Sequence, residues 1–239
     1  MRTWVRVAIG VPAVGFVVLA YLYLTLPDVR ALKTSNPTTT AFIDLREREA
    51  RANGKQPRRM QRWVAYSHVS QDLKRAVLGG EDDAFWQHEG IDMEQLKISI
   101  RNDIEKGQAI RGGSTITQQL AKNLYLSPAR DPIRKLRELI IARRLEAELK
   151  KARIFELYLN VIEWGDGVYG VEAASRIYFQ LSAAELGPTE SAMLAAAIVN
   201  PRVLNPARPS SRLIRRQQLI LRRMGYMTPP ALDSAQHQH

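Results

Sequence analysis

The segment from Val7 to Leu26 contains twenty consecutive residues without a charged side chain. A helix of that length spans about 30 Å, the thickness of the hydrocarbon core of a bilayer. A cleaved secretory signal is the alternative, but residues 21–27 (Tyr-Leu-Tyr-Leu-Thr-Leu-Pro) contain no small-x-small cleavage site. Arg2 and Arg6 precede the segment, which favours a short cytoplasmic end and an exported body. We therefore expect an uncleaved transmembrane anchor.

The whole chain is basic and has no cysteine. Its 35 Lys and Arg residues exceed its 24 Asp and Glu residues and give a formal net charge of +11. This excess favours an anionic partner, which is nucleic acid, an anionic membrane surface or a phosphate-bearing substrate. Aromatic residues are not interleaved with the basic patches, which argues against nucleic acid. Disulfides and thiolate metal sites are excluded, and four histidines, two of them near the C-terminus, do not suggest a zinc site.

Helical periodicity and breaker residues divide the chain into segments. We expect residues 1–6 to be the cytoplasmic end, 7–26 the anchor, 27–57 a linker with one short helix at 40–52, 58–226 a mainly α-helical domain, and 227–239 a disordered tail. Strand signals are few. Residues 107–113 contain three glycines and predict a mobile loop. Within the domain we expect helices at 70–79, 92–107, 114 or 115 to 123, 131–151, 154–161, 190–199 and 212–224.

The first group of residues that suits chemistry follows a glycine pair. Glu81 and Asp82 stand at the expected end of a helix, close to Phe85 and Trp86. Apolar neighbours raise the pKa of a carboxyl group towards the working pH, and this suits acid or base catalysis. The plainer interpretation is that both carboxylates solvate a turn.

The second group is the run Gly-Gly-Ser-Thr-Ile-Thr-Gln-Gln at residues 112–119. A glycine pair that leads into a helix N-terminus directs backbone N–H groups at an anion. Polar side chains of this run supply donors for sugar hydroxyls, and Lys122 adds a positive charge. The spacing of a Walker A loop is absent. An ordinary capped helix with an amide-rich face is the alternative.

The third group is a cluster of cations at residues 130–137, followed by Glu138. On a helix Arg134 and Glu138 are i and i+4 neighbours, so a surface ion pair is the simple interpretation. The cations equally suit a diphosphate, because Arg offers bidentate geometry and Lys a point charge. In a fourth group, Glu156 and Asn160 lie one helical turn apart and suit bracing the site.

Taken in order, these motifs resemble the peptidoglycan glycosyltransferase family. The motifs are E-D-x-x-F-x-x-H-x-G at 81–90, G-G-S-T-I-T-Q-Q at 112–119, R-K-x-x-E at 134–138 and E-x-Y-L-N at 156–160. The family includes the N-terminal domains of bifunctional penicillin-binding proteins and monofunctional transglycosylases. The resemblance covers roughly residues 58–224. It implies a lysozyme-like helical domain with a smaller membrane-facing lobe.

The resemblance also implies a reaction. Family members transfer a growing, lipid-diphosphate-linked glycan to the 4-hydroxyl of a lipid-linked disaccharide-peptide. The reaction inverts the anomeric carbon, forms a β-1,4 bond and releases polyprenyl diphosphate. By motif position, Glu81 is the general base and Glu138 the second carboxylate, which orients the diphosphate or a divalent ion (Mg or Mn). No cofactor is implied with certainty.

The remaining roles come from the same resemblance. The expected substrate-binding residues are Ser114, Thr115, Gln118 and Gln119 for the sugars, with Lys122, Arg130, Arg137, Arg134 and Lys135 for the leaving group. The expected supporting residues are Asp82, Phe85, His88, Glu156 and Asn160, where His88 braces Asp82. The implied location is the inner membrane with the domain on the periplasmic side. The implied partners are the membrane and other cell-wall synthesis or division proteins.

Two other functions compete with this interpretation. A lytic enzyme would use Glu81 as an acid on a glycan polymer, but hydrolysis of a neutral bond does not need the cationic cluster. A non-catalytic scaffold would bind anionic lipid through its basic face, and Glu81 and Glu138 would be dispensable. Neither S-x-x-K nor K-T-G occurs in the sequence, so we expect no transpeptidase activity.

Overall fold

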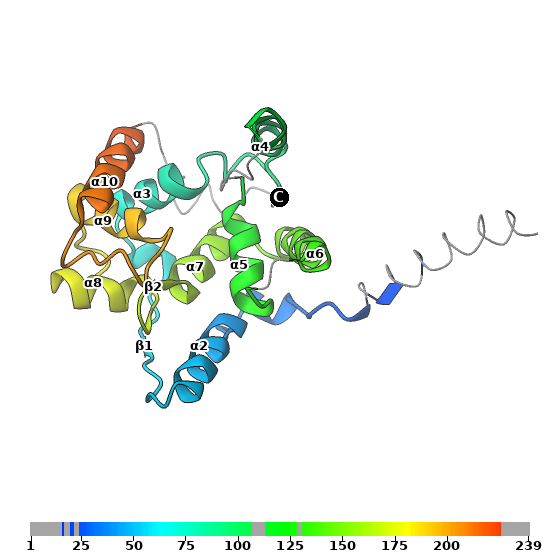
Figure 1. The fold of residues 1–239 in the computed structure, drawn as a ribbon, viewed down its shortest axis with the longest axis horizontal. Coiled ribbons are helices and arrows are strands. Elements are labelled where there is room, and N and C mark those ends of the chain that lie inside the picture. Colours follow the sequence, from blue (N-terminus) through cyan, green and yellow to red (C-terminus); the bar gives the residue numbers. More distant parts are fainter. Residues whose placement is uncertain (1–15, 17–19, 22–23, 107–112, 129–130, 226–239) are drawn as a thin grey trace, which may run out of the picture.

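The computed structural model describes residues 16, 20–21, 24–106, 113–128 and 131–225. These residues are mainly helical, as the sequence predicted (Figure 1). Among them no helix is long and apolar enough to cross a bilayer. Most of the expected anchor at 7–26 lies outside the described residues. So do the expected tail at 227–239, all of the glycine loop except Gly113, and Arg130.

Short helices open the described body and longer helices build it. The 3-10 helices are η1 (Arg30–Lys33) and η2 (Tyr66–His68). The α-helices are α2 (Ala41–Ala52), α3 (Gln71–Glu81), α4 (Met93–Lys106), α5 (Ile116–Tyr125), α6 (Pro132–Glu148), α7 (Lys151–Val161), α8 (Val171–Phe179), α9 (Pro188–Ala197) and α10 (Ser211–Met224). α8 was not predicted from the sequence.

Side-chain caps account for most of the helix starts that the sequence predicted. The side chains of Thr40, Ser70, Thr115 and Asp131 each accept a hydrogen bond from the backbone N–H three residues later. Such a cap satisfies one of the N–H groups that the first turn leaves without a partner. Between the two candidates for the cap of α5, Ser114 and Thr115, the structure selects Thr115.

The end of α3 differs from the prediction. The helix runs through the glycine pair to Glu81 instead of ending at Gly79. A Cβ at Gly80 would lie 3.1 Å from Cδ1 of Ile220, which is tight. The glycine therefore allows α10 to approach α3 closely, and Glu81 becomes the last residue of a helix rather than part of a turn.

The helix expected at 131–151 ends earlier, at Glu148, and the helix expected at 154–161 begins earlier, at Lys151. The chain becomes extended at Leu149, and α7 begins at Lys151. Two apolar residues of α6 face outward, because Ile133 is 58% exposed and Leu136 is 38% exposed. The face of α6 that packs inside carries Glu138 together with Ile141 and Leu145, so a charged residue occupies a position that a purely apolar pattern does not reveal.

A three-stranded sheet joins distant parts of the chain. Its strands are β1 (Met60–Gln61), β2 (Glu163–Gly165) and β3 (Val168–Tyr169), in the order β1-β3-β2. β1 is parallel to β3, and β2 is antiparallel to β3. Gly167 has φ +72°, and a Cβ there would lie 2.7 Å from the carbonyl oxygen of Arg58, so this turn requires glycine.

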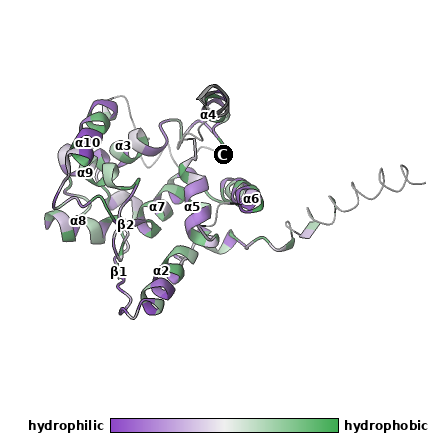
Figure 2. Ribbon diagram, in the orientation of Figure 1, coloured by the Kyte–Doolittle hydropathy of each residue, from purple (hydrophilic) through white to green (hydrophobic). Residues whose placement is uncertain are grey.

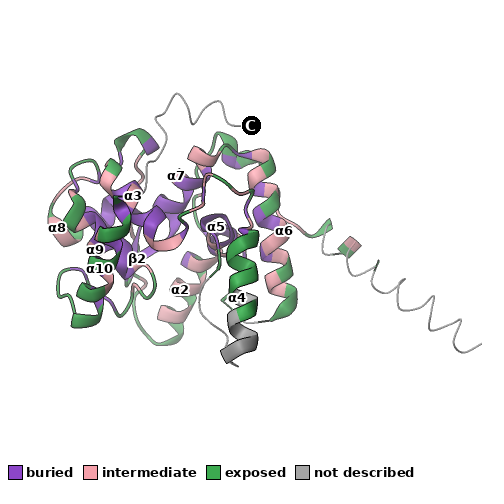
Figure 3. Cartoon of the chain, turned by 90° about the horizontal axis from the view of Figure 1, so that it is seen from above, coloured by how far each residue is buried: buried purple, intermediate pink, exposed green. Residues whose placement is uncertain are grey.

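The core lies between two groups of packed helices. α3 packs against α9 and α10, while α5 packs against α6 and α7. Figure 3 shows buried residues gathered on α3, α5 and α7, whereas the described part of α4 is exposed. α10 alternates hydrophilic and hydrophobic residues along its length (Figure 2) and buries Leu213, Ile220 and Met224.

The segment at 27–57, expected to be a linker, contains η1 and α2. α2 packs against α5, and Ile43 on α2 is fully buried. Val29 and Leu32 are buried as well. These residues therefore pack as part of the folded body.

Candidate active site

Glu81 is held at the end of α3 by two donors from other helices. Its Oε2 accepts a hydrogen bond from Nε2 of Gln119 at 3.0 Å, and its Oε1 accepts one from Nη2 of Arg216 at 3.1 Å. The side chain is 11% exposed. Burial raises the pKa of the Glu81 carboxyl above its ordinary value, and the hydrogen bond from Gln119 and the charges of Arg216 and Lys122 oppose that rise. The carboxylate is thus largely buried, fixed in position and close to cations, and this arrangement suits a general base.

The amide of Gln119 is oriented by a third helix. Its Oε1 accepts a hydrogen bond from the hydroxyl of Tyr158 at 3.0 Å, so its Nε2 faces Glu81. Burial raises the pKa of Tyr158 well above its ordinary value, so the phenol keeps its proton as a donor. Tyr158 on α7 therefore fixes, through Gln119 on α5, one oxygen of Glu81 on α3.

Asp82 joins the turn after α3 to the start of α5. Its Oδ2 accepts a hydrogen bond from the backbone N–H of Ile116 at 2.9 Å, and its Oδ1 lies 2.9 Å from Nε2 of His88. Nδ1 of His88 accepts a hydrogen bond from the N–H of Gly90 at 3.1 Å, which assigns the ring proton to Nε2. His88 therefore contacts Asp82 in the way expected of a brace.

Two of the expected sugar-binding residues are engaged inside the protein. The hydroxyl of Thr115 and the amide of Gln118 both donate to the carbonyl oxygen of Gly90, at 2.7 Å and 3.2 Å. Both side chains are buried, whereas Ser114 is exposed. Thr115 and Gln118 thus stabilise the loop that carries Gly90, and Ser114 is the member of this run that faces solvent.

A cavity of about 260 Å³ adjoins Glu81. It lies between the end of α3, the residues before α5 and the C-terminal part of α10. Its lining residues are Gly79, Gly80, Glu81, Asp82, Asp83, Asp92, Gln95, Gly113, Ser114, Thr115 and Arg223. Glu81 and Ser114, two of the expected site residues, therefore border the same cavity.

Glu138 forms ion pairs with two cations of α6. Its Oε2 lies 2.6 Å from Nη1 of Arg134, and its Oε1 lies 2.5 Å from Nζ of Lys135. Nζ of Lys135 also lies 3.0 Å from Oε1 of Gln118 and 3.3 Å from Oγ of Ser114. The buried carboxylate therefore holds Arg134 and Lys135 against the start of α5.

Lys122 lies within electrostatic reach of both carboxylates. Burial is the largest influence and lowers the pKa of its ammonium group, while the charges of Glu138 and Glu81 raise it. Its Nζ lies 5.8 Å from the centroid of the Phe42 ring on α2. Lys122 thus carries its charge in the region between Glu81 and Glu138, where a cation stabilises developing negative charge.

Arg137 contacts a different part of the chain, since its Nη2 donates to the carbonyl oxygen of Thr25 at 3.1 Å.

The described residues do not provide a set of ligands for a resident metal ion. Within the described ranges no three His, Asp or Glu side chains come together as ligands. Both oxygens of Glu138 are already engaged by Arg134 and Lys135. These residues do not fit a protein-held divalent ion.

The supporting residues pack behind the site. Phe85 is fully buried and lies 5.5 Å from the ring of Phe155. Glu156 accepts a hydrogen bond from the N–H of Tyr66 at 2.8 Å, and Asn160 exchanges hydrogen bonds of 2.8 Å with the backbone of Val64. Glu156 and Asn160 therefore fix the segment before α3 against α7 and do not touch Glu81.

Three residues of this site received no role from the sequence, although Tyr158 stands in the E-x-Y-L-N motif at 156–160. Arg216 contacts Glu81, Tyr158 contacts Gln119, and Arg223 lines the cavity. The basic helix at 212–224 was predicted, but five arginines of that stretch are alike in sequence. Only the packing of α10 against α3 shows which one reaches the carboxylate.

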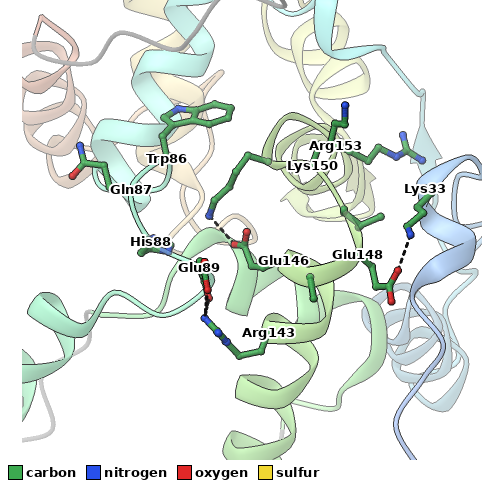
Figure 4. Close-up of a pocket in the computed structure, with 13 residues that line it drawn as sticks. Lys33, Trp86, Gln87, His88, Glu89, Arg143, Glu146, Glu148, Lys150 and Arg153 are labelled. Carbon is green, nitrogen blue, oxygen red and sulfur yellow. Dashed lines mark hydrogen bonds and ion pairs between the residues drawn. The ribbon is translucent and has the colours of Figure 1, made fainter. Parts of the chain in front are cut away.

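A larger cavity, of about 1130 Å³, lies away from Glu81 and shares no lining residue with the first cavity (Figure 4). Carboxylates pair with cations around it at 2.7 to 2.9 Å, namely Glu148 with Lys33, Glu89 with Arg143 and Glu146 with Lys151. Glu146 also accepts a hydrogen bond from the hydroxyl of Thr117 at 2.5 Å. The charges of these pairs are balanced within the protein, unlike the arrangement around Lys122.

Comparison with known proteins agrees with the motifs. A family model described as transglycosylase matches residues 48–225. A biosynthetic peptidoglycan transglycosylase of Laribacter hongkongensis is 42% identical over 221 residues, which are 92% of this chain and 97% of the relative. One from Thiobacillus denitrificans is 42% identical over 231 residues (96% and 100%), and one from Dechloromonas aromatica is 46% identical over 198 residues (83% and 84%). The chain therefore belongs to the transglycosylase family.

Proposed function

We propose that this enzyme polymerises the glycan strands of peptidoglycan. It transfers the growing, lipid-diphosphate-linked glycan to the 4-hydroxyl of a lipid-linked disaccharide-peptide and releases polyprenyl diphosphate. The observation that carries the proposal is the buried carboxylate of Glu81, held by Gln119 and Arg216 beside a cavity and near Lys122. The names of the relatives support the substrate class.

In this proposal Glu81 is the general base. It takes the proton of the acceptor 4-hydroxyl while that oxygen attacks the anomeric carbon of the growing strand. The bond from the anomeric carbon to the diphosphate oxygen breaks, and the electron pair leaves with the diphosphate. Attack from the side opposite the leaving group inverts the anomeric carbon and gives a β-1,4 bond.

The leaving diphosphate gathers negative charge that needs cations. Lys122, Arg134 and Lys135 supply them, and Glu138 fixes the positions of the last two. Arg130 and Arg137 are assigned to this group by their motif positions alone, and the contact of Arg137 with Thr25 does not support its assignment. Ser114 and Gln119 contact the sugars, while Thr115 and Gln118 shape the loop at Gly90.

The lipid substrate requires a protein held at the bilayer. Residues 7–26 anchor it in the inner membrane, with the lysozyme-like domain on the periplasmic side. Exposed apolar side chains support a smaller membrane-facing lobe built from α4 and the start of α6. These side chains are Met93, Leu96, Ile98, Ile133 and Leu136. Cross-linking of strands is left to other proteins, because the sequence carries no transpeptidase motif.

The test is polymerisation of labelled lipid-linked disaccharide by the full-length protein. We expect long glycan from the wild type and a loss of at least about 100-fold in Glu81→Gln, because that change removes the base. Glu47→Gln, on α2, is the matched control and should polymerise normally. Circular dichroism confirms that each variant is folded. Polymer from both variants would remove Glu81 from the mechanism, and no polymer from the wild type would refute the proposed activity.

A further inference from the structure

The last helix brings a cation to the candidate base. α10 buries a stripe made of Leu213, Gln217, Ile220 and Met224. Nε2 of Gln217 donates to the carbonyl oxygen of Thr189 at 3.0 Å, which fixes the rotation of α10 against the start of α9. This rotation turns Arg216 towards α3.

The guanidinium of Arg216 is placed by packing. Its Nη2 lies 3.1 Å from Oε1 of Glu81, and the two side chains are 31% and 11% exposed. Its Nε is buried and has no hydrogen-bond partner among the described residues. A buried donor without an acceptor is unfavourable, so the guanidinium is oriented for its contact with Glu81 and not for its own hydrogen bonding.

The other arginines of α10 behave differently. Arg212, Arg215 and Arg222 are exposed, and Nη1 of Arg223 donates to the carbonyl oxygen of Gly79 at 3.3 Å. Within the described part of the chain, Arg216 is the α10 residue whose charge contacts Glu81. The overall positive charge of α10 therefore does not explain why one arginine contacts the carboxylate.

We propose that Arg216 is a positioning residue of the transfer reaction, which holds the Glu81 carboxylate in the orientation and ionised form that a base needs. The proposal rests on the proposed function. Arg216 occupies one lone pair of Oε1 and Gln119 occupies one of Oε2. Each oxygen of a carboxylate has two lone pairs, so one on each oxygen remains for the acceptor hydroxyl.

Electrostatics explain why such a residue is needed. The groups that act on Glu81 are Lys122 and Gln119 from α5, Tyr158 from α7 and Arg216 from α10. The charged residues that line the cavity with it are Asp82, Asp83, Asp92 and Arg223. Burial favours the protonated acid, which takes up no proton from a hydroxyl. Arg216 and Lys122 counter that tendency. A cation beside the carboxylate, together with the hydrogen bond from Gln119, therefore helps to keep the buried base ionised.

The deciding experiment measures the titration of Glu81 itself. The full-length protein is labelled with ¹³C at the glutamate carboxyl groups, and the Glu81 signal is assigned by its absence from Glu81→Gln. We expect Arg216→Gln to raise the pKa of Glu81 by about one unit or more, since a nearby opposite charge lowers a carboxyl pKa by that amount. Arg216→Lys should give a smaller rise. Arg215→Gln removes the same charge from the exposed face of α10 and should leave the signal unchanged.

The pH profile of polymerisation then ties the contact to the reaction. In Arg216→Gln the acid limb of kcat/KM should move upward with the pKa of Glu81, with about a tenfold loss below that limb and recovery above it. Equal loss at every pH, or equal Glu81 titration in Arg216→Gln and Arg215→Gln, would overturn the proposal. No polymer from the wild type would instead refute the proposed function, and the titration would still report whether Arg216 controls the charge of Glu81.

Discussion

Nη1 of Arg134 lies 2.6 Å from Oε2 of Glu138, one turn along α6, and this carboxylate is buried. Lys135 engages the other oxygen. Removal of the carboxylate leaves two cations close together without a counter-charge, so Glu138→Gln should lower the free energy of unfolding by about 2 kcal/mol. Urea denaturation measures this loss.

The matched control for Glu138 is Glu47, which forms an exposed ion pair with Arg51 at the same i,i+4 spacing. Glu47→Gln should change the free energy of unfolding by less than about 0.5 kcal/mol. Equal effects of the two substitutions would mean that burial of Glu138 adds nothing to the strength of its pairs.

Lys122 should set the alkaline limit of polymerisation. Burial lowers the pKa of its ammonium group, so the group loses its charge at a lower pH than an exposed lysine and activity falls as the pH rises through that value. Lys122→Arg keeps the charge, because the guanidinium stays protonated. We expect the alkaline limb of kcat/KM to move upward in Lys122→Arg. Lys55→Arg, at an exposed position, serves as the control, and an unmoved limb would assign the alkaline loss to another group.

Lys74 makes the stability of the fold depend on pH. It is 2% exposed, its Nζ lies 4.1 Å from the centroid of the Tyr66 ring, and burial lowers its pKa to about 8. In the unfolded chain the pKa is about 10.4. Between these values the unfolded state binds more protons, so stability rises with pH.

Substitution of this lysine tests the effect. Lys74→Met should stabilise the protein at pH 7 by about 1 kcal/mol, because it removes a buried charge, and it should abolish the rise between pH 8 and 10. Urea denaturation at several pH values gives both results. A rise that persists in Lys74→Met would have to come from a different group.

Gly167 and Gly54 provide a matched pair of substitutions. Both have positive φ, +72° and +68°, but an added Cβ meets the Arg58 carbonyl oxygen at 2.7 Å only at Gly167. Gly54→Ala should cost about 1 kcal/mol for the backbone conformation alone. Gly167→Ala should cost about 2 kcal/mol or more, because the β1–β3 junction must also move. Thermal unfolding of both variants isolates the steric contribution, and equal losses would contradict it.

Local patterns predicted much of this fold. The caps at Thr40, Ser70 and Asp131 lie within one turn of the N–H groups they satisfy, so the sequence alone reveals them. The pairing of Arg134 with Glu138 follows in the same way from helical spacing.

Features that depend on distant partners were not predictable. β1 pairs with β3 more than one hundred residues away, and neither strand is longer than two residues. The break at Leu149 carries no proline or glycine. Arg216 differs from its neighbouring arginines only through the contact of α10 with α3, which no local pattern encodes.

The contact between Arg216 and Glu81 also bears on when the site is completed during synthesis of the chain. The two residues are 135 positions apart, so a ribosome that adds about 5–20 residues per second exposes the carboxylate on the order of ten seconds before its partner. During that interval the nascent chain has α3 but lacks α10. A chain that ends before α10 therefore lacks one of the two cations near Glu81, and the arrangement around this carboxylate is complete only when the last helix has docked.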